Sequence, residues 1–267
     1  MNSLKACMPS MSVASWSWPK WWRRCSSTLG AVPDPHALEG VLTSARILEL
    51  QESPVNGRFD VAHLREAHRR IFQDLAHHRP GEFRPQVRTH FKTRVLEGEG
   101  TQYVIGYAGG DLGPRVERVL SELQGGAALE GLALDECAER LSQLYGDLDH
   151  LHPFQEGNSR TLREFTRELA LHAGYELDWY STSADANTRD RLDVARDLEV
   201  YERQYPGLNA EMLKAYGRHR DFAQMHHASH MLTVFRERER LASIIREQLV
   251  LLRRVHPASS SDGTAQG

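Results

Sequence analysis

The chain is poor in cysteine and has no long hydrophobic run. Its 267 residues include three cysteines, Cys7, Cys25 and Cys137, and none of them forms a Cys-x-x-Cys pair. An odd, dispersed set of thiols encodes neither a disulfide framework nor a zinc ribbon, and it favours a reducing compartment. No apolar stretch reaches the roughly 18 residues that a membrane-spanning helix needs. We therefore expect no transmembrane segment, and we expect Cys137, at an apolar helical position, to be buried and inert.

Neither sign of charge dominates, and no residue type is in great excess. Lys and Arg number 33 against 36 Asp and Glu, so the formal net charge is −3. Such a balance lacks the basic field of a nucleic-acid-binding protein, and we expect no nucleic-acid partner. Glycine (20) and proline (11) are at ordinary levels, which excludes a collagen-like or low-complexity chain. With 40% hydrophobic residues, the chain is expected to fold around a real core.

The two ends of the chain differ from its body. Residues 1–35 hold four of the five tryptophans among many serines and prolines, which interrupt any apolar stretch long enough for a secretory signal. We expect a disordered extension there, with a secretion or membrane-surface segment as the alternative. Residues 253–267 read as a disordered polar tail. The folded domain is therefore expected over residues 36–252.

Most of the body carries apolar residues at three- and four-residue spacing, which predicts helices. The expected helices cover residues 37–50, 59–77, 114–123, 135–151, 188–201, 210–216 and 221–252, together with one that begins near Ser159 and is stopped by Gly174. Between residues 79 and 113 the helical period is lost. There, residues 102–107 (QYVIGY), flanked by glycines, predict a short strand of a β-hairpin.

The segment from His152 to Arg163 (HPFQEGNSRTLR) combines backbone features suited to phosphate binding. One predicted helix ends just before it, and another is predicted to begin at about Ser159. The start of a helix offers unpaired N–H groups and a partial positive charge to an anion. Gly157 would let the backbone approach that anion closely, as glycines do in phosphate loops. The turn therefore predicts an anion site.

The side chains of this segment add the remaining parts of a nucleotide site. Asn158, Arg160 and Arg163 can donate to phosphate oxygens, the arginines through forked guanidinium groups. Glu156 is a single hard-oxygen ligand, of the kind that Mg²⁺ uses when phosphates and water complete its shell. His152 lies at the rim and can accept a proton. Each residue alone would be ordinary surface, but together they predict a nucleotide, Mg²⁺ and a general base.

The same segment resembles the Fic family signature, His-Pro-Phe-x-Asp/Glu-Gly-Asn-Gly/Lys-Arg-x-x-Arg. The stretch from His68 to Arg84 and residues 169–179 (LALHAGYELDW) resemble the flanking segments, so the resemblance covers roughly residues 37–200. It implies an all-α, Fic-type helical domain with a short β-hairpin flap before the motif helix. The chain departs at Ser159, where the family usually has glycine. A serine there costs about 1 kcal/mol if φ is positive, and is comfortable if the residue is already helical.

The resemblance implies a protein adenylyltransferase that moves AMP from ATP to a Tyr, Thr or Ser hydroxyl of a target protein and releases pyrophosphate. His152 would be the general base, and Glu156 would hold Mg²⁺. The phosphates of ATP would lie against Gly157, Asn158, Ser159, Arg160 and Arg163. The flap would pair with an extended piece of the target protein by strand addition, through Gln102, Tyr103, Val104, Ile105, Gly106 and Tyr107.

The resemblance also implies an inhibitor. Many family members are inhibited by a helix with the pattern Ser/Thr-x-x-x-Glu-Gly/Asn, whose Glu pairs with the second motif arginine, here Arg163. Three segments resemble that helix in part: 243–248 (SIIREQ), 233–238 (TVFRER), and the Glu39-Gly40 pair, which has Pro35 at the Ser/Thr position. A separate antitoxin protein is the alternative to such a self-inhibitory helix.

Other readings stay open at this stage. The chemistry of related proteins includes transfer of UMP or another nucleotide and transfer of phosphate, and a non-catalytic nucleotide-binding module is a further alternative.

His226 and His230 lie at i, i+4 spacing, but no third metal ligand follows at a convincing distance, so a solvated or packed cluster is favoured. The chain is expected to be cytoplasmic, with a secreted effector as the alternative, and the sequence leaves open whether it is a resident toxin or an exported effector.

Overall fold

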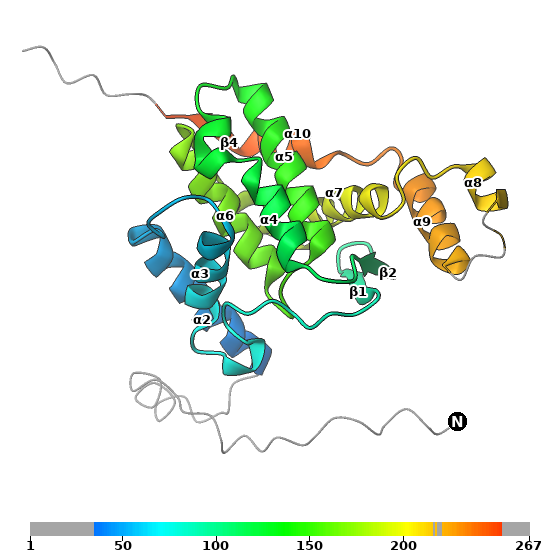
Figure 1. Cartoon of the computed structure of the whole chain (residues 1–267), viewed down its shortest axis with the longest axis horizontal. Coiled ribbons are helices and arrows are strands. Elements are labelled where there is room, and N and C mark those ends of the chain that lie inside the picture. The colour runs from blue at the N-terminus through cyan, green and yellow to red at the C-terminus, as the bar shows by residue number, and fades with distance from the viewer. Residues whose placement is uncertain (1–34, 216, 218–220, 253–267) are drawn as a thin grey trace, which may run out of the picture.

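The computed structural model describes residues 35–252 except 216 and 218–220 (Figure 1). The extension and the tail expected at the two ends lie outside the described residues, apart from Pro35, so the domain limits expected there stay predictions. Among the described residues, no helix is both long enough and apolar enough to cross a membrane.

Helices dominate the described chain, as the sequence pattern predicts. In chain order they are α2 (Pro35–Glu52), α3 (Val61–Phe72), α4 (Gly113–Ser121), α5 (Leu134–Leu151), α6 (Asn158–His172), α7 (Ala186–Gln204), α8 (Ala210–Ala215), α9 (Phe222–Val234) and α10 (Leu241–Gln248). Short 3₁₀ turns lie at η2 (Ala76–His78), η3 (Gln124–Leu129) and η4 (Ser181–Ser183).

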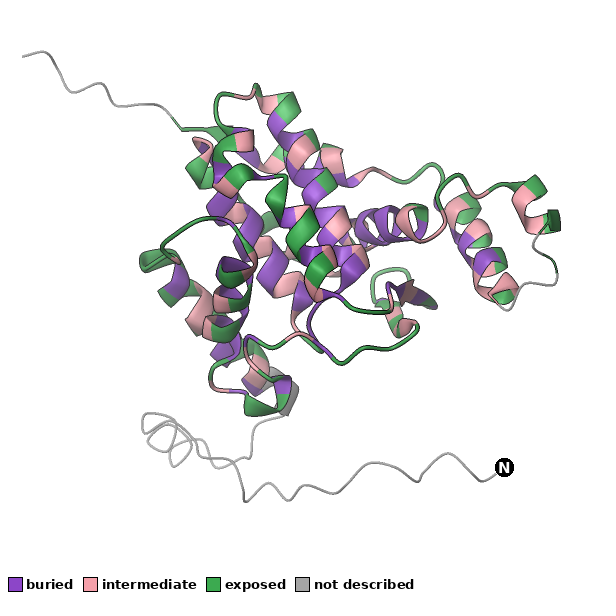
Figure 2. Ribbon diagram, in the orientation of Figure 1, coloured by how far each residue is buried: buried purple, intermediate pink, exposed green. Residues whose placement is uncertain are grey.

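The core is built around α5, which lies against α4, α6, α7 and α10 (Figure 1). Its buried stripe is the one that the spacing predicts, Cys137, Leu141, Leu144, Leu148 and Leu151. Figure 2 shows that buried residues follow the facing sides of these central helices. Burial raises the pKa of the Cys137 thiol to about 11, which keeps it protonated and unreactive, as expected.

α3 begins where the sequence predicts and ends earlier than expected. Asp60 is its N-cap, and the Asp60 carboxylate accepts a hydrogen bond from the His63 N–H. The helix stops at Phe72, and the chain continues through a turn into η2, which carries His77 and His78. The expected helix to residue 77 is therefore wrong by one turn, because the chain bends to place Leu75 in the core beside α2.

The predicted β-hairpin is present and lies against α7. Strands β1 (His90–Leu96) and β2 (Thr101–Tyr107) are antiparallel, with His90 opposite Tyr107. Alternate residues of β2 (Tyr103, Ile105 and Tyr107) are buried in a cluster with residues of α7 and α9. Because the period of a strand is two, Gln102 and Val104 face outward.

The single helix expected over residues 221–252 is wrong. The chain forms α9, leaves the helix after Val234, and resumes as α10 at Leu241. It then ends in strand β4 (Leu249–Leu251), which pairs with β3 (Tyr175–Leu177). The intervening charged residues bind distant partners: Arg238 pairs with Glu99, and Arg240 pairs with Glu202. Tertiary contacts thus override a local helical pattern.

Candidate functional site

His152 is the residue that ends α5. Its backbone is in the left-handed region (φ 47°), so the chain turns sharply there into the motif loop. Arg84, itself buried, stabilises this turn by donating to the carbonyl oxygens of His152 (2.7 Å), Leu151 (3.1 Å) and Ala108 (2.5 Å). The last carbonyls of a helix lack partners within the helix, so one guanidinium both caps α5 and fixes the position of His152.

The imidazole of His152 is buried (4% exposed) and lies under the hairpin. It stacks on the Tyr107 ring of β2, with 3.8 Å between centroids. The His152 Nδ1 atom lies 3.5 Å from a carboxylate oxygen of Asp149, which in turn forms an ion pair with Arg196 at 2.9 Å. A carboxylate only accepts hydrogen bonds, so the ring proton belongs on Nδ1, and Nε2 keeps its lone pair.

The protonation states of His152 and Asp149 follow from their surroundings. Burial lowers the pKa of His152 to about 3, and the neighbouring Asp149 opposes that shift only in part. Burial also disfavours the charged form of Asp149, but Arg196 outweighs it and holds the pKa of that carboxyl below its usual value. At neutral pH the site therefore contains a neutral imidazole beside a buried ion pair.

The loop after His152 is held by a second buried histidine. His68 accepts from the Gly81 N–H at Nδ1 (2.9 Å), so its Nε2–H donates to the Glu156 carbonyl (3.1 Å). Its ring stacks on Phe154, with centroids 3.8 Å apart. Burial lowers the pKa of His68 to about 4, so both hydrogen bonds are kept by a neutral ring at neutral pH.

Gly157 and Asn158 shape the start of α6. Gly157 has φ +79°, and a Cβ there would lie 2.0 Å from the Phe72 ring, so no other residue fits. The Asn158 amide is buried and bonds both the N–H and the carbonyl of Phe154. Both polar atoms of the Asn158 side chain are thus used within the loop. Its backbone N–H is the donor that it can offer to a ligand.

The N-terminus of α6 lies at the position where the sequence predicts an anion site. The Thr161 N–H bonds the Gly157 carbonyl, which leaves the N–H groups of Asn158, Ser159 and Arg160 without acceptors in the helix. Ser159 is helical and lies outside the left-handed region, so the serine is comfortable at this position. Its hydroxyl oxygen accepts from Arg196 at 3.1 Å.

Glu156 faces the hairpin. Its carboxylate is half-exposed (49%) and lies 2.9 Å from the ammonium of Lys92 on β1. Both residues line a small cavity of about 180 Å³. Around this cavity lie the residues of the expected site, His152, Gly157, Asn158, Ser159 and Arg160. The fold therefore brings these residues together in one place.

The two motif arginines have different partners. Arg160 donates to Glu39 (2.5 Å) and to the Thr43 hydroxyl (3.0 Å), both on α2. Arg163 donates to the Ser183 hydroxyl (2.7 Å), and no carboxylate of the described residues forms an ion pair with it. Burial lowers the pKa of Arg163. Both guanidinium groups line a larger cavity of about 570 Å³ that Trp179 and Tyr180 also line.

The three segments that resemble an inhibitory helix are placed differently by the structure. Glu39 reaches the motif helix but pairs with Arg160, whereas the family pattern implies Arg163. Glu247, from residues 243–248, pairs with Arg191, and Glu237, from residues 233–238, pairs with Arg236. Of the three, the structure brings only the Glu39 segment to a motif arginine.

The histidines of α9 do not gather metal ligands in the part of the chain that the structure describes. His227 bonds the Val104 carbonyl of β2 at 2.8 Å, and its other contact is the Tyr201 hydroxyl. His226 and His230 are exposed. This agrees with a packed and solvated cluster.

Sequence reasoning missed Asp149, Arg196 and Lys92. Asp149 lies three residues before His152, a spacing that puts both on one side of the last helical turn. That spacing was available as a signal. Arg196 lies on α7 and Lys92 on β1, and nothing in their local sequence marks them as neighbours of the motif.

Acid is expected to destabilise this fold at a pH where most carboxylates are still ionised. His68 and His152 have folded-state pKa values of about 4 and about 3. In the unfolded chain both should be near 6.5, so the unfolded state binds more protons between about pH 4 and pH 6.5. Stability is then full above that window and falls as pH decreases through it, by about 1.4 kcal/mol per pH unit for each imidazole.

The measurement is the urea unfolding free energy as a function of pH. His68→Phe keeps a stacked ring and removes one titrating group, so the slope should decrease by about one proton. His172→Ala, which removes an exposed histidine, is the matched control variant. A stability that is flat between about pH 6.5 and pH 5 would contradict the neutral state of these rings.

Comparisons with known proteins find related sequences and related folds. Residues 58–170 match the sequence model of the Fic/DOC family. The protein adenylyltransferase VbhT of Bartonella schoenbuchensis is 30% identical over 158 residues, 58% of this chain. This chain covers only 30% of VbhT. The probable protein adenylyltransferase y4lH of Sinorhizobium fredii is 28% identical over 180 residues, which cover 66% of this chain and 81% of that protein.

Solved structures agree on the fold. The BepC protein of Bartonella tribocorum, a VirB-translocated effector crystallised with bound AMPPNP, has a TM-score of 0.55 and 20% identity. The alignment covers 83% of this chain and 90% of that one. The Fic domain of a Bartonella effector (Bep) gives a TM-score of 0.51 with 21% identity, over 79% of this chain and 84% of that one. The match to the Fic/DOC family model thus runs from just before α3 almost to the end of α6, residues 58–170.

Proposed function

We propose that this protein transfers AMP from ATP to a hydroxyl side chain of a target protein. The observation that carries the proposal is His152, whose Nε2 atom is unbonded and whose ring is neutral, beside the free N–H groups of α6. Support also comes from the similarity to VbhT, a protein adenylyltransferase, and to y4lH, a probable protein adenylyltransferase, and from the AMPPNP bound to BepC.

In the proposed reaction, a Tyr, Thr or Ser hydroxyl of the target attacks the α-phosphorus of ATP. His152 Nε2 takes the hydroxyl proton as the oxygen–phosphorus bond forms. The bond between the α-phosphorus and the bridging oxygen breaks, and its electron pair leaves with pyrophosphate. Asp149, 3.5 Å from Nδ1, orients the ring and stabilises the imidazolium that results. The α6 N–H groups supply fixed dipoles for the charge on the transferred phosphate.

The arginines are suited to the outer phosphates of ATP. Arg163 is a partly buried cation without an acidic partner among the described residues, and it lies in the 570 Å³ cavity. An anion bound there would supply the missing counter-charge, and a guanidinium fork fits phosphate oxygens. Arg160 lines both this cavity and the one around His152, so it can bridge them.

Glu156 fits a magnesium ion. A single half-exposed carboxylate at the edge of the cavity is the protein ligand that Mg²⁺ uses when substrate phosphates and water fill its other positions. Mg²⁺, when bound, neutralises charge on the phosphates. Lys92 is the cation that this carboxylate binds in the structure, at 2.9 Å, so it would compete with the metal for Glu156.

Lys92→Met is therefore expected to lower the Mg²⁺ concentration needed for half-maximal activity. A partly exposed ion pair is worth about 0.2–1 kcal/mol, which corresponds to a decrease of about 1.4- to 5-fold. The measurement is the initial rate against Mg²⁺ concentration. Thr93→Val, which changes an outward-facing residue on the same strand, is the control. An unchanged or increased Mg²⁺ requirement in Lys92→Met would refute competition between the ammonium and the metal.

The target protein is proposed to add a strand to the hairpin at β1. On β2, the Val104 carbonyl already accepts hydrogen bonds from His227 and from the Tyr201 hydroxyl, so the outer edge of β2 is engaged within the chain. On β1, Phe91 (46% exposed) and Val95 (55%) offer apolar contacts to an added strand. In this arrangement β1 pairs with the strand of the target protein, and residues 102–107 of β2 support β1 at its other edge.

The test separates AMP transfer from its alternatives. Purified protein is incubated with candidate target extracts, Mg²⁺ and ATP labelled either at the α-phosphate or at the γ-phosphate. Protein-bound α-label that depends on His152 is the expected result. Label from the γ-position alone would show phosphate transfer instead. Label from UTP but not from ATP would show UMP transfer. No label from any nucleotide, despite measurable ATP binding, would favour a non-catalytic module.

Control of the site within the chain is proposed to come from α2. Glu39 forms an ion pair with Arg160 and so competes with the phosphates of ATP for that guanidinium group. A separate antitoxin is then not required to restrain the enzyme. Its role as a toxin or effector, its compartment and its target stay predictions.

A further inference from the structure

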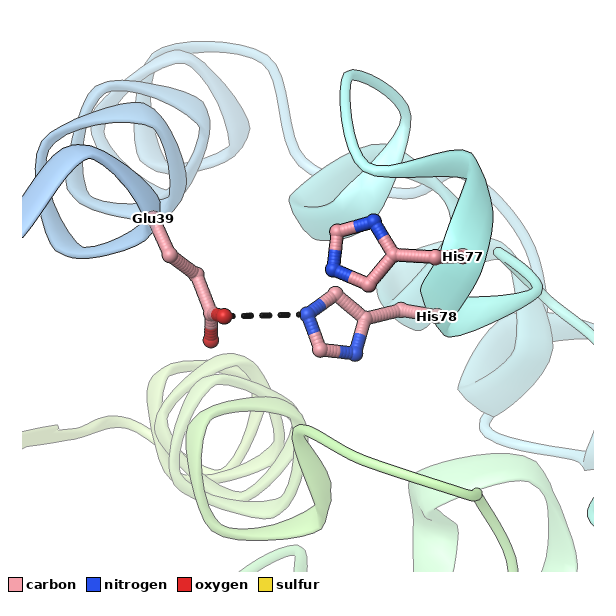
Figure 3. A group of neighbouring side chains, drawn as sticks. All are labelled: Glu39, His77 and His78. Carbon is pink, nitrogen blue, oxygen red and sulfur yellow. Dashed lines mark hydrogen bonds and ion pairs between the residues drawn. The ribbon is translucent and has the colours of Figure 1, made fainter. Parts of the chain in front are cut away.

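A cluster of potential metal ligands lies where α2 meets η2, and it shares only Glu39 with the site described above. Glu39 projects from α2, and His77 and His78 are consecutive residues of η2 (Figure 3). The ligand atoms of the three side chains all lie within 4.8 Å of one another. Figure 3 shows that both imidazole rings turn a nitrogen toward the side on which Glu39 lies.

The distances are close to those of a tetrahedral metal centre. Bonds of about 2.0–2.1 Å from zinc to nitrogen or oxygen place neighbouring ligand atoms about 3.3 Å apart. Glu39 Oε2 and His78 Nε2 are already 3.1 Å apart. The ring centroids of His77 and His78 are 4.2 Å apart. Ligand atoms within 4.8 Å of one another must approach by up to about 1.5 Å to reach this spacing, and a shift of the exposed His77 leaves the core in place.

The surroundings hold two of the three ligands in place. His78 is buried (6% exposed), and its ring packs edge-on against Phe72 at 5.2 Å. The other oxygen of Glu39, Oε1, accepts from Arg160 at 2.5 Å. A ligating carboxylate is commonly held through its second oxygen in this way. Two imidazoles and one carboxylate suit Zn²⁺, with water as the fourth ligand.

We propose that Glu39, His77 and His78 bind Zn²⁺ and that the ion ties α2 to η2. The metal takes the place of the proton that Glu39 and His78 share, and it adds His77 to their contact. Arg160, whose positive charge lies beside the same carboxylate, weakens the binding without preventing it. Zn²⁺ binding can be tested apart from the proposed AMP transfer, because it needs neither nucleotide nor target, although the two share Glu39.

The test uses the full chain, freed of metal with a chelator and then titrated with Zn²⁺ by calorimetry and with Co²⁺ by visible absorption. We expect one tight Zn²⁺ per chain and the intense visible bands of a tetrahedral Co²⁺ site. His77→Ala, His78→Ala and Glu39→Gln should each weaken binding by at least about tenfold, as the loss of groups that hold a metal does. His77→Ala, at an exposed position, should keep the fold even if His78→Ala does not.

Two control variants use the other histidine sites of the chain. His172→Ala removes an exposed histidine that also faces a carboxylate, Glu130 at 3.2 Å, but without a third ligand. His226→Ala combined with His230→Ala removes the i, i+4 pair of α9. Both controls should leave Zn²⁺ affinity unchanged. Amide hydrogen exchange in α2 should also slow when Zn²⁺ is added to the parent and should not change in His77→Ala.

Three results would overturn the proposal. The first is Zn²⁺ affinity that survives both His77→Ala and Glu39→Gln. The second is affinity that disappears in the variant lacking His226 and His230. The third is the absence of any tetrahedral Co²⁺ spectrum in the parent.

Discussion

Replacing His152 with alanine is expected to lower the rate of AMP transfer by a factor of about 10² to 10⁴, the usual contribution of a positioned general base. The Nε2 atom of His152 is unbonded, and the ring is neutral because burial lowers its pKa to about 3. His90 is the neighbouring imidazole, stacked on His152 with 5.6 Å between ring centroids, and its Nε2 atom is also unbonded. The measurement is the initial rate of α-label transfer at saturating ATP.

The design must separate loss of the base from loss of the loop conformation. His152 has φ 47°, a conformation that alanine adopts at a cost of about 1 kcal/mol and asparagine adopts more readily. His152→Asn therefore keeps the backbone and removes the base, and it should be as inactive as His152→Ala. His150→Ala, whose side chain bonds Gln204 away from the loop, is the matched control and should stay active. If His152→Asn kept half of the parent's rate of AMP transfer, His152 would be excluded as the general base.

The pH dependence of the same rate follows from the sign of the pKa shift. A base with a lowered pKa stays deprotonated as pH falls, so its acid limb should lie well below the value of about 6.5 of a free imidazole. Loss of rate near pH 5 would then report the unfolding expected from His68 rather than titration of His152. Comparison of the rate profile with the stability profile distinguishes the two causes.

Much of this site could be predicted because its parts are consecutive in the chain. A helix end, a turn with Gly157 and a helix start place His152, Glu156 and the α6 N–H groups together by local geometry alone. The same applies to the hairpin, whose strand alternation and flanking glycines are local signals. The arrangement of α5 also follows from its own apolar stripe.

The remainder depends on contacts between distant residues, which local patterns do not contain. Arg84 is 68 residues from His152, and Arg196 is 47 residues from Asp149. The break after Val234 is likewise set by partners elsewhere in the fold. Asn158 illustrates a further limit: its residue type suits phosphate binding, and only the structure shows that Phe154 already uses both polar atoms of its amide.

Replacing Glu39 with glutamine is expected to raise the rate of AMP transfer by about 5- to 150-fold. The Glu39 carboxylate holds Arg160 at 2.5 Å, and the Thr43 hydroxyl adds a second bond at 3.0 Å. Burial opposes ionisation of Glu39, but Arg160 and His78 outweigh it, so its pKa lies below the ordinary value and the ion pair persists at neutral pH. Phosphates must compete with that carboxylate for Arg160, and a coupling of about 1–3 kcal/mol between such contacts gives this range.

Matched variants identify the cause of any activation. Glu49→Gln removes an acid from the same helix, but Glu49 binds Arg46 and lies apart from Arg160, so its rate should equal that of the parent. His77→Ala removes a proposed Zn²⁺ ligand and leaves the Glu39–Arg160 pair intact, so it should not activate if the carboxylate alone restrains the enzyme. Activation by His77→Ala to the level of Glu39→Gln would instead assign the restraint to the metal. A Glu39→Gln enzyme no faster than the parent, with ATP binding unchanged, would show that Arg160 is free to serve the phosphates even while it is paired with α2.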